Sequence, residues 1–217
     1  MNTAPKSWLN DARLWMITDT AAARGRAIPE LVAQGVAGGV DVVVVRFKEL
    51  SGPPFISAAR PIAAICRDLG VPWVLSHNLD LVSALDPDGV HLGAGDPTIA
   101  EARAQLARNA VIGYSAHTIG EIGRVKAAGA DYAWFSPIYP TKKDGKAVFG
   151  IGVESARRAL ETAGDFPLVF LGGVNADNAH ELAAIGGTRI AAIGAIIGAD
   201  DVESAARKLK AALSGES

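Results

Sequence analysis

Short apolar runs rich in Val, Ile and aromatic residues alternate with amphipathic segments about eight times along this 217-residue chain. The runs are typical of strands, whereas segments such as 28–39, 119–130 and 154–165 repeat their apolar residues at helical spacing. Strand followed by helix, repeated within one domain length, predicts parallel βαβ units. Eight such units predict a closed (β/α)8 TIM barrel rather than an open sheet. The expected strands are residues 13–19, 40–48, 72–77, 89–93, 110–117, 132–138, 167–174 and 189–197.

No low-complexity or Pro/Ser-rich linker interrupts this repeat, so we expect a single domain over residues 1–217. The barrel core is expected at about 12–200, and the amphipathic segment at about 201–215 is expected to form a closing surface helix. A formal net charge of -2 argues against binding to nucleic acid or a membrane surface, which needs a basic excess. The N-terminus has no signal-peptide pattern and no apolar run reaches membrane-spanning length, so we expect a cytoplasmic protein.

The second expected strand, VDVVVVRFK at 40–48, ends in two cations, Arg46 and Lys48. Successive side chains of a strand alternate between its faces, so both cations share the face of Val44. Unpaired charge beside a core is costly, so the two cations need either acidic partners or a bound anion. Glu49 and Asp41 are possible acidic partners in this stretch. We favour an anion, because two cations converge at one end of a buried strand.

The active site of a TIM barrel forms at the carboxyl ends of the strands and in the loops that follow them. In this fold the loops after strands seven and eight commonly hold a phosphate, and glycine N–H groups can approach an anion closely. We therefore expect a phosphorylated ligand, with one phosphate near the glycines and a second anionic group near Arg46 and Lys48. The other candidate residues at these strand ends are Ser76, His77, Asp96, Ser115, Thr141, Lys142, Gly172, Gly173 and Gly194.

Three nearby features have a structural interpretation. His91 lies inside the apolar run 89–93, which favours a hydrogen-bonded core histidine over a ligand. His117 precedes Thr118 and a helical segment, which favours a helix-start residue. The segment GAII at 194–197 is expected to begin a short extra helix, whose N-terminus attracts negative charge.

Several motifs in the chain are similar to those of a known family. They are GVHLGAGD at 89–96, IGYSAHTIGEIGRVKAAGADYAWFSPIYPTK at 112–142 and PLVFLGGVNADNA at 167–179. In these motifs the chain resembles thiamine phosphate synthase and its relatives, the TenI-like thiazole tautomerases. The resemblance implies a TIM-barrel transferase that joins hydroxymethylpyrimidine pyrophosphate to thiazole phosphate, releases pyrophosphate and needs Mg²⁺. It also implies phosphorylated pyrimidine and thiazole molecules as partners, and we add a homodimer as an expectation.

The resemblance also implies a role for each matching position. Arg46 and Lys48 would bind the pyrophosphate, and Asp96 would be a magnesium ligand. Ser115 would contact the leaving group or the pyrimidine. Phosphate or pyrophosphate oxygens would be bound by Thr141 and Lys142, and the thiazole phosphate by the N–H of Gly173 with Ile193 and Gly194 nearby.

The sequence departs from the family pattern in two strands. Val44 stands where Gln is usual, and Ser76 and His77 stand where the family has an Asn-Asp pair, so one magnesium carboxylate is missing. Two alternatives to the synthase therefore stay open. One is a thiazole tautomerase in which His77 acts as acid and base, because Pro137 occupies the position of the tautomerase histidine. The other is a divergent enzyme or a non-catalytic binder of a phosphorylated heterocycle.

Overall fold

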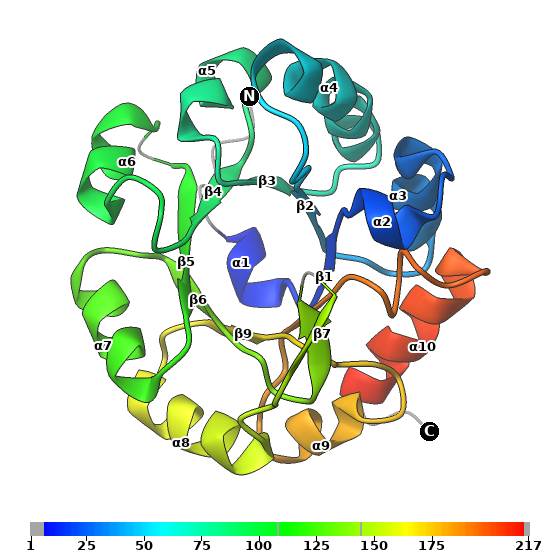
Figure 1. Cartoon of the computed structure of the whole chain (residues 1–217). Coiled ribbons are helices and arrows are strands. Elements are labelled where there is room, and N and C mark those ends of the chain that lie inside the picture. The colour runs from blue at the N-terminus through cyan, green and yellow to red at the C-terminus, as the bar shows by residue number, and fades with distance from the viewer. Residues whose placement is uncertain (1–6, 108, 144, 215–217) are drawn as a thin grey trace.

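The computed structural model describes residues 7–107, 109–143 and 145–214, and it has the predicted TIM-barrel fold (Figure 1). Eight parallel strands close into one ring, and the last strand, β10, pairs with the first. Each of the eight predicted strands is present, although each strand is shorter than expected. The strands are β1 (Leu14–Ile17), β2 (Val42–Val45), β3 (Trp73–Ser76), β4 (Gly89–Leu92), β5 (Val111–Ala116), β6 (Tyr132–Phe135), β9 (Leu168–Phe170) and β10 (Ile190–Ala192).

Most helices surround the ring of strands, whereas α1 lies across the ring in the view of Figure 1. Two of them begin with a capping box, in which Thr98 and Thr118 each exchange hydrogen bonds with a Glu three residues later. The N–H of His117 donates to the second of these glutamates, which confirms its interpretation as a helix-start residue. The helices are α1 (Trp8–Asp11), α2 (Thr20–Ala23), α3 (Ile28–Ala37), α4 (Gly52–Asp68), η1 (Leu79–Leu81), α5 (Val82–Leu85), α6 (Ile99–Gln105), α7 (Ile119–Ala127), α8 (Val153–Ala163), α9 (Ala179–Ala184) and α10 (Val202–Ser214).

Helix α10 spans residues 202–214 of the segment 201–215 in which a closing helix was expected, and residue 215 lies outside the described residues. The prediction of a short extra helix beginning at 194–197 is wrong. Ile196 and Ile197 both donate to the carbonyl of Ile193, so the segment makes hydrogen-bonded turns that do not continue as a helix. Within the described residues, no helix has the length and apolar character needed to cross a membrane.

In every barrel strand except β4, alternate residues belong to two separate apolar clusters. Leu14, Met16, Val43 and their counterparts pack against the helices in the outer cluster. The intervening residues fill the inside of the barrel, because side chains of a strand alternate between its faces. This interior cluster contains Trp15, Ile17, Val42, Val44, Val74, Val111, Tyr132, Trp134, Val169 and Ala191.

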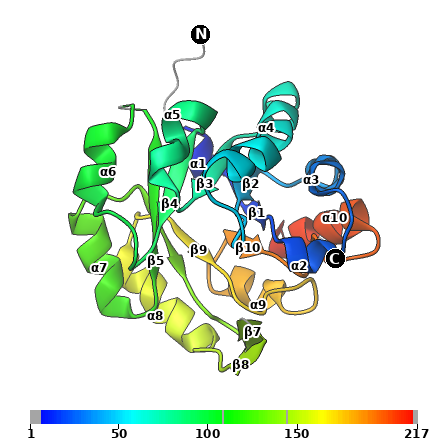
Figure 2. The ribbon, with the colours of Figure 1, turned by 45° about the horizontal axis from the view of Figure 1, so that its top comes forward.

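The two ends of the barrel differ. At the amino end of the strands, α1 packs its Trp8 ring against Trp15 of the interior cluster, with ring centroids 5.8 Å apart. A two-stranded antiparallel hairpin, β7 (Thr141–Lys143) and β8 (Lys146–Val148), follows β6 at the other end. Figure 2 shows the hairpin projecting from the barrel on the side away from α1. The carboxyl ends of the strands therefore form the open end, which we call the mouth.

Candidate active site at the barrel mouth

Arg46 follows β2 at the mouth. Val44 is fully buried in the interior cluster, so Arg46, two residues later, continues the inward-facing row. Its backbone is fixed by Thr18, whose hydroxyl accepts from Arg46 N–H at 2.8 Å and donates to the Arg46 carbonyl at 2.9 Å. One guanidinium nitrogen pairs with a carboxylate oxygen of Asp19 at 3.2 Å. A guanidinium has five N–H donors, so this single contact leaves donors for a ligand.

Glu49 adds a second carboxylate beside the cations. It accepts a hydrogen bond from the Thr20 hydroxyl, and this bond, helped by the charges of Arg46 and Lys48, lowers the pKa of Glu49. Asp19 and Glu49 therefore offset part of the positive charge at the end of β2. Arg46 is half-buried, whereas Lys48 is exposed and lies beyond the end of β2.

Asp41 is not a partner of these cations, and that possibility is wrong. It precedes β2, at the amino end of the barrel, where it accepts from the N–H groups of Arg13 and Leu14 at 2.8 Å. Its carboxylate also pairs with Lys210 of α10. The strand separates it from the mouth, because a strand advances about 3.3 Å per residue.

Ser76 and His77 differ in depth. Ser76 is the last residue of β3 and is buried, whereas His77 is exposed. His77 and Asn78 have left-handed backbone with φ of 61° and 51°, so the strand ends abruptly there. His77 Nδ1 lies 2.5 Å from Asp96 Oδ2, and the same oxygen accepts the N–H of Gly93 at 2.6 Å. The carboxylate expected to bind magnesium is therefore in contact with an imidazole.

Ser115 lies near the carboxyl end of β5 and is half-buried. Its Oγ is 2.9 Å from His91 Nε2, and the other ring nitrogen is 3.1 Å from the Tyr132 hydroxyl. His91 is 1% exposed and stacks on Trp134 with ring centroids 3.5 Å apart. Burial lowers the pKa of His91 well below its ordinary value, so the ring is neutral at pH 7. The interpretation of His91 as a hydrogen-bonded core histidine is confirmed.

Gly172 and Gly173 follow β9 with φ of 90° and 71°, a backbone conformation that favours glycine. A Cβ on Gly172 would lie 2.5 Å from the Cβ of Pro137, so this glycine also allows close packing against the loop after β6. Across the described part of the chain, neither Gly173 N–H nor Gly194 N–H donates to a protein acceptor. These amides at the ends of β9 and β10 are available to an anion.

Thr141 and Lys142 lie on the β7 strand of the hairpin. Thr141 is half-buried and Lys142 is exposed. Pairing of Lys142 with Ala147 gives this segment a fixed register. Ile193, directly after β10, is half-buried and packs on both apolar clusters.

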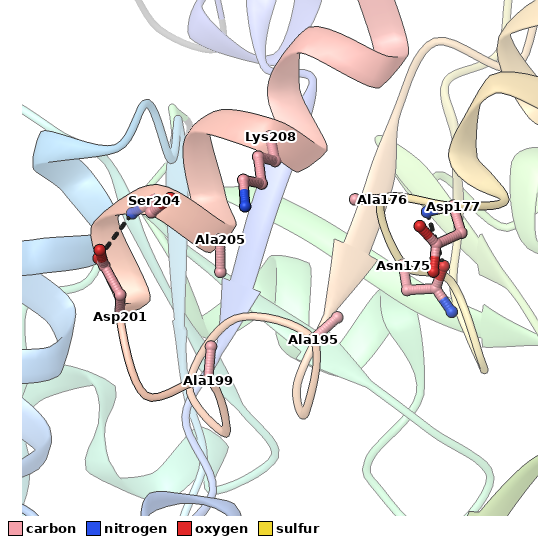
Figure 3. A pocket seen from close by; sticks show the side chains of 9 residues that line it. All are labelled: Asn175, Ala176, Asp177, Ala195, Ala199, Asp201, Ser204, Ala205 and Lys208. Carbon is pink, nitrogen blue, oxygen red and sulfur yellow. Dashed lines mark hydrogen bonds between the residues drawn. The ribbon is translucent and has the colours of Figure 1, made fainter.

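A surface pocket of about 350 Å³ lies between α10 and the loops after β9 and β10 (Figure 3). Lys208 extends into it from α10, while Asp177 lines it from the β9 loop and Asp201 from the start of α10. Asp201 accepts the N–H of Ser204 at 2.9 Å and so caps the helix. Two carboxylates accompany one cation there, which is a poor complement for an anionic ligand.

Three residues that organise the mouth were not predicted from the sequence. Asp19, the partner of Arg46, ends the first apolar run, and an acid at the end of strand one was the available signal. Tyr132 is on β6 and His91 is on β4, with β5 between them, so only the register of the three strands brings the two side chains together. Asn178 donates its side-chain amide to the Gly173 carbonyl at 3.0 Å and thereby holds the β9 loop.

Known proteins match the chain over nearly its whole length. The thiamine monophosphate synthase family matches residues 14–196. The thiamine-phosphate synthase of Chloroflexus aurantiacus is 36% identical over 204 residues, which cover 94% of each chain. That of Methanoculleus marisnigri is 37% identical over 197 residues, covering 91% of this chain and 93% of the relative.

Solved structures agree with these matches. A thiamine phosphate pyrophosphorylase from Pyrococcus furiosus has a TM-score of 0.84 and 30% identity, covering 95% of this chain and 98% of its own. A 3-hexulose-6-phosphate synthase, at 21% identity and a TM-score of 0.66 over 92% of this chain and 99% of its own, shares the fold alone. The resemblance read from the motifs, and with it the expected synthase-like transferase, is confirmed: the chain belongs to the thiamine monophosphate synthase family.

Proposed function

We propose that this chain joins hydroxymethylpyrimidine pyrophosphate to thiazole phosphate and releases pyrophosphate. The observation that supports this most is the combination of Arg46 and Lys48 at the end of β2 with unpaired amides at the ends of β9 and β10. One mouth thus offers two separate anion sites, as two phosphorylated substrates require. The thiazole nitrogen forms a bond to the methylene carbon of the pyrimidine, and the carbon–oxygen bond to the pyrophosphate breaks.

In this proposal Arg46 and Lys48 bind the leaving pyrophosphate, whose negative charge grows as the carbon–oxygen bond breaks. Preorganised positive groups stabilise such developing charge. Asp19 holds one nitrogen of Arg46, and both side chains are mostly buried, at 21% and 17% exposure. The guanidinium is thereby positioned before the ligand arrives, which lowers the cost of ordering it on binding.

The thiazole phosphate is proposed to bind at the N–H groups of Gly173 and Gly194. Backbone N–H groups without a protein acceptor are good partners for phosphate oxygens. Thr141 and Lys142 on β7 then contact phosphate or pyrophosphate oxygens from the hairpin. Ser76 and Ile193 are proposed to contact the bound rings, because both lie at strand ends of the mouth.

Magnesium is proposed to accompany the pyrophosphate. The described residues contain no cluster of three or more His, Cys, Asp or Glu that could hold a metal ion. One carboxylate, that of Asp96, is enough to fit Mg²⁺, because this ion often binds one or two carboxylates and takes its remaining ligands from phosphate oxygens and water. The chemistry that Mg²⁺ supplies when bound is neutralisation of charge on the leaving group. Asp96 would hold the ion while His77 and the Gly93 N–H fix the carboxylate.

The test is direct synthesis. Purified protein is incubated with both phosphorylated precursors and Mg²⁺, and thiamine phosphate is measured by chromatography. We expect product that requires both precursors and that falls strongly in Lys48→Ala. Arg158→Ala is the matched control, because Arg158 is an exposed cation on the outer helix α8. Absence of product after a long incubation, beside a working synthase from a relative, would reject the proposal.

The contact between His77 and Asp96 favours a second candidate function, thiazole tautomerisation. A carboxylate that holds one imidazole nitrogen fixes the tautomer and leaves the other nitrogen to transfer a proton. The measurement is exchange of ring protons with deuterated solvent in a thiazole carboxylate phosphate. Exchange that is lost in His77→Gln, without synthase activity, would select this function instead.

The expected homodimer and the cytoplasmic location are part of the proposal. Analytical ultracentrifugation measures the first: a sedimenting species of about 45 kDa is twice the chain mass of 22.4 kDa and would support it, whereas a species of the chain mass would not.

A further inference from the structure

A hydrogen-bonded chain leads from the barrel interior to the mouth through Tyr132, His91 and Ser115. His91 on β4 pairs in register with Gly113 on β5, which pairs with Tyr132 on β6. A Cβ on Gly113 would lie 2.0 Å from the Tyr132 Cζ atom and 2.4 Å from its hydroxyl oxygen. The missing side chain at 113 therefore lets the Tyr132 ring cross β5 and reach His91. The chain of contacts depends on this one glycine.

Packing holds the middle of this chain in one orientation. His91 Nδ1 lies 3.1 Å from the Tyr132 hydroxyl and His91 Nε2 lies 2.9 Å from Ser115 Oγ. The imidazole stacks on Trp134 at an interplanar angle of 24°, which prevents it from rotating out of line. His91 and Tyr132 are buried, and Ser115 alone is partly exposed. Solvent and ligands therefore meet this chain at Ser115.

The direction of the hydrogen bonds follows from the burial of Tyr132. Its hydroxyl has His91 as its one hydrogen-bond partner among the described residues. A buried hydroxyl that only accepted would leave its own proton unsatisfied, which is costly. The Tyr132 O–H therefore donates to His91 Nδ1. A neutral imidazole then carries its proton on Nε2 and donates it to Ser115 Oγ.

We propose that Tyr132 and His91 are positioning residues that turn the Ser115 hydroxyl proton toward the mouth, where it donates a hydrogen bond to an oxygen of the leaving pyrophosphate. The inference deepens the proposed function, because it gives Ser115 a defined polarity at that same site. A donor at this oxygen stabilises the negative charge that it gains as the carbon–oxygen bond breaks. No proton is transferred in this step, and Ser115 stays a hydroxyl throughout.

The first test reads the tautomer of His91 in the free protein. The chain has four histidines, and the other three, His77, His117 and His180, are exposed. A variant with these three replaced by Gln, labelled with ¹⁵N histidine, gives one imidazole signal in nuclear magnetic resonance spectra. We expect the proton on Nε2 at pH 7.5, and a change of tautomer or exchange between tautomers in Tyr132→Phe. A proton on Nδ1 in the variant that keeps Tyr132 would overturn the inference.

The second test uses inorganic pyrophosphate with Mg²⁺ as the probe in calorimetry. Ser115→Ala is expected to weaken pyrophosphate binding about tenfold, as for the loss of one hydrogen bond to a charged group. Tyr132→Phe is expected to weaken it about threefold, since polarisation along a chain of hydrogen bonds is a partial effect. In the Ser115→Ala background the same Phe substitution should change nothing further. Tyr114→Phe, on the same strand outside the chain of contacts, is the matched control.

Equal effects of Tyr132→Phe with and without the Ser115 hydroxyl would overturn the inference, because Tyr132 would then act by another route. Both tests run without turnover. A chain that makes no thiamine phosphate but has the Nε2 tautomer and coupled binding would refute the synthase and keep the polarity of Ser115. A working synthase with the Nδ1 tautomer would support the synthase and refute the polarity of Ser115.

Discussion

Mild acid should destabilise this fold through His91. Burial lowers the pKa of His91 well below 6.5 in the folded chain. In the unfolded chain the imidazole takes up a proton as the pH falls through about 6.5, whereas the folded chain does not bind it until its own lower pKa is reached. The unfolded state therefore binds more protons, and the free energy of unfolding decreases as the pH falls below about 6.5. Above that pH, His91 adds no pH dependence.

The size of this effect follows from one proton. A difference of one bound proton changes the free energy of unfolding by about 1.4 kcal/mol per pH unit. Between pH 7.5 and 5.0, His91 alone should lower the free energy of unfolding by about 2 kcal/mol. The whole free energy of unfolding of a typical domain is about 5–15 kcal/mol. Burial raises the pKa of Asp88, which favours the folded state at acid pH and opposes part of the loss.

The assay is urea unfolding at pH 7.5 and 5.0 of the natural chain and of His91→Gln. The natural chain should lose about 2 kcal/mol more than the variant between the two pH values, since Asp88 is present in both and cancels. His117→Gln, a change at an exposed histidine, serves as the control and should keep the full loss. Equal losses in the natural chain and in His91→Gln would refute the reasoning.

Three further predictions concern the mouth. Lys48→Ala should weaken binding of pyrophosphate about tenfold in calorimetry, and more at low salt than at high salt, as for a charged contact; an unchanged affinity would remove Lys48 from the site. His77→Asp should tighten the binding of Mg²⁺ in the presence of pyrophosphate about tenfold, because it supplies a second carboxylate near Asp96; weaker binding would contradict this. Gly172→Ala should lower the free energy of unfolding in urea by about 2 kcal/mol or more, because φ is 90° and the added Cβ would lie 2.5 Å from Pro137. Gly194→Ala should lower it by less than about 0.5 kcal/mol, because the space around its Cβ is open.

The barrel was predictable because its strands are apolar on both faces and separated by helical periodicity. The hairpin β7–β8 was not predicted, since its strands are short and polar. The Asp144-Gly145 dipeptide between them was the available hairpin signal. The short helix expected after β10 does not form, because the hydrogen bonds there make separate turns that do not continue as a helix.

The contacts within the mouth were harder to predict than its location. Alternation of side chains placed Arg46 on the inner face, but its partner Asp19 follows β1, 27 residues earlier in the chain. The contact of His77 with Asp96 needs left-handed backbone at a residue other than glycine, which sequence patterns do not reveal. The link from Ser115 through His91 to Tyr132 depends on the register of three neighbouring strands. Strand patterns give a residue's face, whereas such partners are set by tertiary packing.

The most direct measurement is a crystal structure of the chain grown with thiamine phosphate, pyrophosphate and Mg²⁺. We predict pyrophosphate in contact with Arg46 and Lys48, and the phosphate of thiamine phosphate on the N–H groups of Gly173 and Gly194. Pyrophosphate bound elsewhere, with Arg46 still engaged only by Asp19, would contradict the account.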